Sequence, residues 1–191
     1  MNAYKEVAPL TASVRKQHAL PQMNATLLEA IYNEHYDNVH NYICFRINNH
    51  FDAEELANDV FINAIKRYDT YRPHLAPVQA WLIGIAKNTI VDYFRAKKRK
   101  TFVPLDDVVE LASLARQPED VVVFNETNRA LMRAMSALKD KERQILSMKF
   151  ATDLRNSEIA DIMGVSNTNV ATIANRAIIK LKKIMKREEK L

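Results

Sequence analysis

Residues 81–100 read WLIGIAKNTIVDYFRAKKRK, a stretch that begins as an amphipathic helix and ends as a block of positive charge. Its apolar residues recur at three- and four-residue steps and therefore share one helical face: Trp81, Leu82, Ile85, Ala86, Ile90 and Tyr93. Five cations then occupy the six positions from Arg95 to Lys100. A helix with one packed face and a basic end can hold a phosphate backbone, although many basic helix ends are simply solvated.

The composition predicts an all-α protein. The 191 residues include two glycines, which argues against a turn-rich β architecture. The six prolines leave three proline-free runs, 22–72, 78–103 and 119–191. Each run carries helical periodicity, and hydrophobic residues make up 48% of the chain, enough for real cores.

Charge and cysteine content restrict the partners and the compartment. The net charge of +5 favours an anionic partner such as nucleic acid or a membrane surface. No apolar run approaches the roughly 20 residues of a membrane span, and the N-terminus lacks a signal-peptide pattern. With Cys44 as its single cysteine, the chain has no internal disulfide, which fits a reducing cytoplasm. We expect a cytoplasmic protein in which Cys44 is a small core residue.

The chain divides into four segments: an N-terminal arm at 1–22, a helical domain at 23–100, a linker at 101–125 and a second helical domain at 126–191. The linker is rich in acidic residues and contains Pro104 and Pro118. Fully extended, it would reach on the order of 80 Å, roughly two turns of a DNA duplex. A flexible linker of this length would let the two domains contact one duplex at separate places.

Two helices are expected before residue 81, over 27–47 and 51–69. Asp52 is the expected N-cap of the second, with Glu55 at capping-box spacing, and Ile65 is expected on its inward face. The outward face of its first half is acidic, which either the helix dipole or docking to a basic partner would explain. His35, Asp37 and His40 are potential metal ligands, but the two histidines are five apart, and helical ligand pairs are usually three or four apart. We therefore expect no metal site.

The loop 69–77 contains two prolines and is flanked by aromatic residues. Tyr68, Tyr71 and Arg72 could stack against unpaired bases. Loop aromatics also commonly cover a core, and the sequence alone leaves both interpretations open.

The second domain is predicted to form four helices. Asp140 is the expected N-cap of the second, Asn156 or Ser157 that of the third, and Ser166 that of the fourth. Residues 157–176, SEIADIMGVSNTNVATIANR, match a helix-turn-helix, with a small Ala160 at the helix crossing and Gly164 at the turn. The alternative is an ordinary helical hairpin. In a helix-turn-helix the second helix enters the major groove, and its exposed positions would be Asn167, Thr168, Asn169, Thr172, Asn175 and Arg176. Asn suits adenine and Arg suits guanine.

These motifs together resemble the bacterial extracytoplasmic-function (ECF) sigma factors of RNA polymerase. DAEELANDVFINAIKRYD at 52–69 is similar to the family's DAEDLxQExF segment, and residues 81–100 to its WLxxIAxNxxxDxxRxxxR segment. Residues 137–150 and 158–177 resemble its C-terminal promoter-reading domain. The resemblance covers about 24–100 and 125–187, with the two motif sets in the family's order.

The resemblance implies a subunit that binds core RNA polymerase, recognises promoter DNA and promotes strand opening. Region 2, at 23–100, would dock on polymerase through Asp52, Glu54, Glu55, Asn58 and Asp59. It would read and open the proximal promoter element through Tyr71, Arg72, Trp81, Lys87, Asn88, Arg95, Lys97, Lys98 and Arg99. Region 4, at 126–191, would read the distal element through the six helix-turn-helix residues. An anti-sigma factor is a further expected partner, and no cofactor, small-molecule substrate or membrane insertion is expected.

The chain departs from the family at several positions. Asn58 replaces the usual Gln, and Ala171 and Ile173 stand where many members carry Lys and Arg, which would reduce phosphate contacts in the recognition helix. A stand-alone helix-turn-helix regulator is the main alternative function, and it would bind duplex DNA tightly without polymerase. An enzyme is disfavoured, because the sequence lacks a Gly-rich phosphate loop, an HExxH motif and a Cys/His cluster with ligand spacing.

Overall fold

A computed structural model describes residues 24–100 and 126–188. Within these ranges the chain forms seven α-helices and one short 3-10 helix, without a β-strand, which confirms the all-α prediction. The arm at 1–22 and the linker at 101–125 lie outside the described residues. None of the helices in the described ranges is both long enough and apolar enough to cross a membrane.

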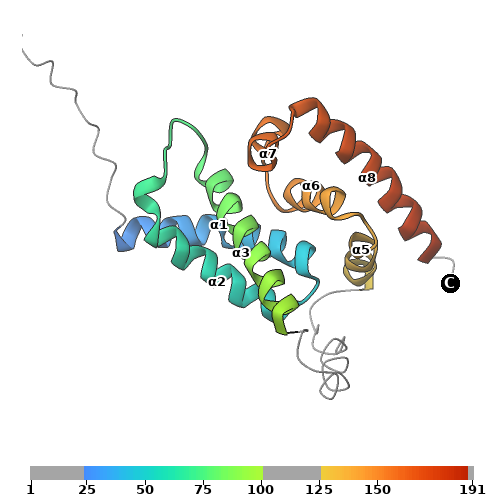
Figure 1. Cartoon of the computed structure of the whole chain (residues 1–191), viewed down its shortest axis with the longest axis horizontal. Coiled ribbons are helices and arrows are strands. Elements are labelled where there is room, and N and C mark those ends of the chain that lie inside the picture. The colour runs from blue at the N-terminus through green and yellow to red at the C-terminus, as the bar shows by residue number, and fades with distance from the viewer. Residues whose placement is uncertain (1–23, 101–125, 189–191) are drawn as a thin grey trace, which may run out of the picture.

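The N-terminal half consists of three helices, α1 (Ala25–Ile47), α2 (His50–Lys66) and α3 (Val78–Lys100), with η1 (Tyr68–Thr70) after α2. Figure 1 shows them packed side by side. Val39 and Ile43 of α1, Val60 of α2, and Leu82 and Ile83 of α3 are almost completely buried and form the centre of the core. Cys44 is buried, as expected for a core residue, and burial raises the pKa of its thiol to about 12.

The start of α2 differs from the sequence prediction. Asn49 is the N-cap, and its side chain accepts a hydrogen bond of 3.2 Å from the backbone N–H of Asp52. Asp52 lies inside the first turn, where its charge suits the helix dipole, so its assignment as N-cap was wrong. Asn competes well with Asp at this position, and the left-handed Asn48 just before it turns the chain sharply out of α1.

The C-terminal half consists of α5 (Glu126–Ser136), α6 (Asp140–Ala151), α7 (Asn156–Met163) and α8 (Asn167–Glu188). The four helices appear where the sequence predicts them. Met135, Ile145, Leu146, Ile159 and Val170 are fully buried and form their core. In Figure 1, α8 is the long helix at the right, running past α7, α6 and α5.

Two of the predicted caps in this half were wrong. Lys139 and Arg155 are the N-caps of α6 and α7, and neither offers a side-chain cap bond. Instead a glutamate three residues on accepts from the N-cap backbone N–H, Glu142 at 2.9 Å and Glu158 at 2.7 Å. These are one half of a capping box, which suffices without Ser, Thr, Asp or Asn at the cap.

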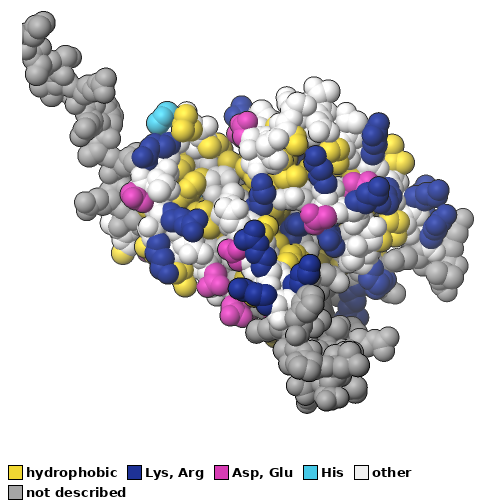
Figure 2. Space-filling view, viewed as in Figure 1, with side chains coloured by type: hydrophobic (Ala, Val, Ile, Leu, Met, Phe, Trp, Pro, Cys, Tyr) yellow, Lys and Arg dark blue, Asp and Glu magenta, His cyan; other side chains and the backbone are white. Residues whose placement is uncertain are grey.

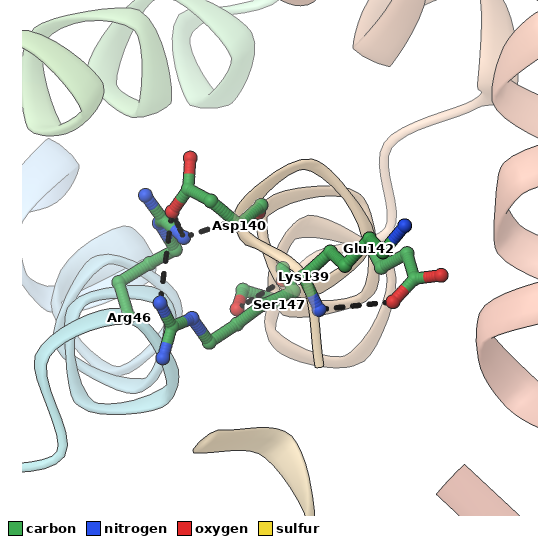
Figure 3. Close-up of polar contacts among 6 residues, drawn as sticks. Arg46, Lys139, Asp140, Glu142 and Ser147 are labelled. Carbon is green, nitrogen blue, oxygen red and sulfur yellow. Dashed lines mark hydrogen bonds and ion pairs between the residues drawn. The ribbon is translucent and has the colours of Figure 1, made fainter. Parts of the chain in front are cut away.

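The two halves pack against each other, with α1 against α6 and α5, and α3 against α7. Arg46 near the end of α1 is buried and forms an ion pair of 2.8 Å with Asp140 at the start of α6, as Figure 3 shows. Phe45 and Phe150 meet edge to face, with ring centroids 6.3 Å apart. The sequence predicted domains that act at separate places, whereas this structure is a closed arrangement of the two.

Candidate nucleic-acid interface

The turn between α7 and α8 has the geometry of a helix-turn-helix. Gly164 has a φ of +63°, in the left-handed region that favours glycine. The Val165 N–H donates to the Ala160 carbonyl at 3.0 Å, which closes the end of α7. Ser166 caps α8 as predicted, because its hydroxyl accepts from the Asn169 N–H at 3.2 Å. No atom lies within 4 Å of a Cβ added at Gly164, so backbone conformation rather than space requires glycine there.

The recognition surface of α8 is formed by exposed side chains. All six residues predicted for it are exposed: Asn167, Thr168, Asn169, Thr172, Asn175 and Arg176. The opposite face of the helix carries the buried Val170, Ala174 and Ala177. Five of the six are uncharged, so this surface offers hydrogen-bonding groups with little net charge.

Ile173 explains part of the departure from basic residues in α8. Its side chain is half-buried and packs against the core. A long cation at this position would have to leave that contact. The position is therefore used for packing rather than for an exposed charge.

Basic residues gather toward the end of α8. Lys182, Lys183, Lys186 and Arg187 are exposed. Lys180 instead forms an ion pair of 2.9 Å with Glu142 of α6. This bond, with that from the Lys139 N–H, holds the pKa of Glu142 below its usual range. Four cations thus remain exposed along the last two turns.

The end of α3 is the second basic surface. Arg95, Lys97, Lys98 and Arg99 are all exposed, as the sequence predicts. Arg95 pairs with Asp92 at 3.3 Å, and the Lys97 ammonium lies 5.6 Å from the ring centroid of Tyr93. Figure 2 shows Lys and Arg side chains spread over both halves on the face in view. Two regions far apart in sequence thus offer cations for a polyanion.

Lys87 and Asn88, in the middle of α3, differ in availability. Asn88 is exposed. Lys87 is half-buried, and its ammonium donates to the Ile162 carbonyl of α7 at 2.7 Å. Ile162 lies in the last turn of α7, where backbone carbonyls have no partner within the helix. The Lys87 ammonium thus provides a hydrogen-bond donor for one of these carbonyls. In the closed arrangement Lys87 is therefore engaged between the halves.

The aromatic residues around the loop form a cluster with each other. The Tyr71 ring lies 5.0 Å from the ring of Trp81, and Tyr68 lies about 6 Å from both. Tyr68 is buried, whereas Tyr71 and Trp81 are half-buried. Arg72 is exposed, and its guanidinium donates to the Asp69 and Tyr71 carbonyls. The cluster covers this end of the core and keeps part of two aromatic faces at the surface.

The outward face of α2 is both acidic and apolar. Glu54, Glu55, Asn58 and Asp59 are exposed, as predicted. Asp52 is half-buried, because the Tyr93 hydroxyl of α3 donates to its carboxylate at 2.5 Å. Burial, and to a smaller extent this hydrogen bond, raises the pKa of the Tyr93 hydroxyl well above its usual range. Asp52 is therefore tied to α3.

Sequence analysis missed the apolar part of this face. Phe51, Ile62 and Ile65 are 61%, 47% and 43% exposed, so the inward placement of Ile65 was wrong. The three fall at i, i+11 and i+14, which places them on one side of the helix. This face of α2 therefore combines exposed acidic side chains with exposed apolar ones.

Comparison with known proteins identifies the architecture. The Sigma-70 region 2 family matches residues 31–100, and the Sigma-70, region 4 family matches residues 128–181. RNA polymerase sigma factor YlaC of Bacillus subtilis is 30% identical over 160 residues, covering 83% of this chain and 91% of YlaC. ECF RNA polymerase sigma factor BldN of Streptomyces coelicolor is 27% identical over 155 residues, which are 81% of this chain and 59% of BldN.

A solved structure shares the fold. It is that of the sigma factor RpoE from Bartonella quintana, crystallised with the anti-sigma factor NepR. The likeness has a TM-score of 0.66 at 17% identity and covers 83% of this chain and 96% of that one. With both Sigma-70 regions matched in order and a relative at 30% identity over most of its length, this chain belongs to the ECF sigma factors of RNA polymerase.

Proposed function

We propose that this chain binds core RNA polymerase through α2 and recognises a promoter through α3 and α8, so that transcription starts at promoters with two spaced elements. The observation that carries this proposal is the presence of three exposed surfaces of different chemistry. The surface of α3 is basic, that of α8 is rich in amides and hydroxyls, and that of α2 is acidic and apolar. Each surface suits the binding of a different partner.

The outward face of α2 is the proposed polymerase contact. Glu54, Glu55, Asn58 and Asp59 supply charge, and Phe51, Ile62 and Ile65 supply exposed apolar area. Interfaces of this kind gain most from buried apolar anchors, whereas rim charges mainly set orientation and association rate. Asp52 is included as a positioning residue, since its bond to Tyr93 joins α2 to α3.

The α3 surface is the proposed site for the proximal element and strand opening. Arg95, Lys97, Lys98 and Arg99 would contact phosphates, and Asn88 would contact a base. Tyr71 and Trp81 keep part of their rings at the surface, so an unpaired base can stack there. Arg72 and Lys87 would join these contacts after leaving their present backbone partners.

The α8 surface is the proposed site for the distal element. Asn167, Thr168 and Asn169 lie in its first turn, the part of a recognition helix that reaches base edges. Thr172, Asn175 and Arg176 continue the same exposed face. Phosphate contacts would come from Lys182, Lys183, Lys186 and Arg187, which compensates for Ala171 and Ile173.

An anti-sigma factor is the proposed regulatory partner, and the cytoplasm is the proposed compartment. The Bartonella relative of similar fold was crystallised with such a factor. The surfaces that polymerase and promoter need are spread over both halves, so one partner that contacts both halves could block them together.

In vitro transcription with core polymerase tests the proposal. The purified protein should direct new transcript starts that share two spaced upstream elements. The double variant Glu54→Lys and Asp59→Lys should weaken core binding and abolish these starts. Glu29→Lys with Asp153→Lys makes the same charge change at exposed positions outside α2 and should leave binding unchanged.

Equal core affinity for both double variants would contradict the α2 contact. Tight, sequence-specific binding of duplex DNA without polymerase, together with an absence of starts, would instead support a stand-alone helix-turn-helix regulator. A gel shift with the protein alone separates these outcomes.

A further inference from the structure

Three metal-ligating side chains meet where α1 turns into α2. His40 and Cys44 come from α1, and His50 is the first residue of α2. Their ligand atoms all lie within 4.8 Å of one another, and the Cys44 sulfur is 3.6 Å from Nε2 of His40. Among the described residues this is the one group of three or more His, Cys, Asp or Glu residues with such proximity.

The local backbone holds the three residues together. His40 and Cys44 are four residues apart, so they project from one face of α1. The chain then turns within two residues: Asn48 adopts the left-handed conformation and Asn49 caps α2. This short turn folds His50 back, and its ring meets that of His40 edge to face, with centroids 5.2 Å apart. The last two turns of α1 and the first residue of α2 therefore hold the three side chains in place.

The donor set suits a borderline-soft cation. Two imidazoles and one thiolate are ligands that Zn²⁺ prefers, whereas Mg²⁺ and Ca²⁺ require oxygen ligands. With Zn–N and Zn–S bonds of standard length, neighbouring donor atoms of a tetrahedral site lie about 3.3–3.6 Å apart. The distance between Cys44 and His40 already matches, and the remaining distances need to close by at most about 1.5 Å, which side-chain rotation can supply.

The site has room for a fourth ligand from solvent or from α2. Cys44 is buried, whereas His40 and His50 are half-exposed, so the group opens toward the surface on one side. Glu54 follows His50 by four residues, lies on the same side of α2 and is exposed. A water molecule or this carboxylate would complete a four-coordinate shell.

We propose that His40, Cys44 and His50 form a binding site for a divalent cation of the zinc class. The cation replaces the proton of the Cys44 thiol, which passes to solvent, and links the end of α1 to the start of α2. On one side of this link Arg46 forms an ion pair with Asp140 of α6, and on the other Glu54 belongs to the proposed polymerase contact. Metal occupancy would thereby make the α1–α2 corner more rigid.

Cobalt substitution tests the site directly, because Cys44 is the only thiol in the chain. The full-length protein is purified under reducing conditions, stripped with chelator and titrated with Co²⁺ and then Zn²⁺. We expect one equivalent of Co²⁺ to give a thiolate charge-transfer band and tetrahedral d–d bands, which Zn²⁺ displaces. A Co²⁺ spectrum without the thiolate band would overturn the proposal, and this readout needs no variant.

Variants measure the contribution of each ligand. Cys44→Ala and His50→Ala should each lower zinc affinity by at least about 100-fold, since even outer-shell partners are worth 10–100-fold. His74→Ala is the matched control, because His74 is exposed on the loop before α3, and should leave zinc affinity unchanged. Circular dichroism confirms that each variant folds. Zinc affinity that stays the same in folded Cys44→Ala would show adventitious surface binding and reject the site.

Discussion

The residues proposed to contact DNA are held in different ways in the two halves. In α8 all six predicted residues are exposed, and the opposite side of the helix is buried in the core and holds the helix in place. In the N-terminal half, Tyr71 and Trp81 pack on each other, Arg72 binds nearby carbonyls, and Lys87 binds a carbonyl of the other half. The proposed recognition surface of the C-terminal half is thus preformed, whereas several residues of the proposed surface in the N-terminal half would have to leave their present partners before contacting DNA. This difference fits the proposed tasks, because reading a duplex requires a fixed surface and opening one requires groups that change partners.

Matched cavities in the two cores are expected to have the largest effect. Ile83→Ala in α3 and Ile145→Ala in α6 each remove a fully buried side chain, so each should lower the free energy of unfolding by about 2–5 kcal/mol. Because buried Tyr42 and Arg46 of α1 interact with Gln144 and Asp140 of α6, both variants should shift a single common transition in urea. Ile179→Ala, at a 70% exposed position, is the control and should change little. Two separate transitions would show that the halves are independent.

The ion pair between the halves should respond unequally to loss of its two members. Asp140 is 68% exposed, so its charge stays hydrated when Arg46 is replaced, whereas Arg46 is buried. Asp140→Ala should therefore cost about 3 kcal/mol, since it leaves a buried cation without its carboxylate. Arg46→Met keeps the volume and removes the charge, and should cost far less. Urea unfolding of both variants measures the difference, and equal losses would contradict the asymmetry.

Recognition and phosphate contacts in α8 should be separable. Asn169→Ala should cost at least about 1 kcal/mol on a promoter with the preferred distal element and little on one with that element altered. Lys182→Ala should weaken binding to both promoters equally and reduce the slope of log affinity against log salt by about 1. The measurement is binding of the polymerase complex to the two promoters over a range of salt concentrations. If both variants behaved alike, the proposed division within α8 would fail.

The smallest expected effect concerns His35 in α1. Burial lowers the pKa of His35, an effect that the nearby Glu34 partly opposes. In the unfolded chain the pKa of a histidine is about 6.5. In weak acid the unfolded chain therefore binds more protons than the folded chain. Neutral His35 therefore contributes to the free energy of unfolding. This contribution is fully present above the pKa of the unfolded chain and is lost as the pH falls through the lowered pKa of the folded chain. The loss of unfolding free energy between pH 7.5 and pH 5.5 should be smaller in His35→Leu than in the unmodified protein. An equal loss in the two proteins would contradict this role of His35.

The sequence predicts each helix and the exposed residues of α8, because hydrophobic periodicity and a required glycine are local properties. The predicted helices of both halves were confirmed, including the cap at Ser166 and the end at Gly164. Caps at Asp52, Asp140 and Asn156 or Ser157 were wrong, because several neighbouring polar residues compete for each helix start. Asn49 is the cap in the first case, and a glutamate three residues on satisfies the backbone in the other two.

Contacts between distant segments could not be predicted in this way. Lys87 and Ile162 are separated by 75 residues, and no spacing rule relates them. The trio of His40, Cys44 and His50 also depends on a tight turn that places two helix ends side by side. The sequence analysis considered His35, Asp37 and His40 and expected no metal site, because spacing along one helix carries no information about His50 at the start of α2.

Under the proposed function Lys87 contacts DNA, so its bond to the Ile162 carbonyl would make the closed arrangement compete with DNA binding. A ligand that needs a minority conformation binds with an apparent Kd raised by the inverse of that conformation's population. Every 1.4 kcal/mol or so that favours closure would then weaken promoter affinity about tenfold. A polymerase that bound the separated halves would remove this penalty before DNA arrives. Polymerase and promoter DNA would then bind cooperatively without touching the same residues. The strength of the Lys87 contact would help to set how weakly the free protein binds promoter DNA.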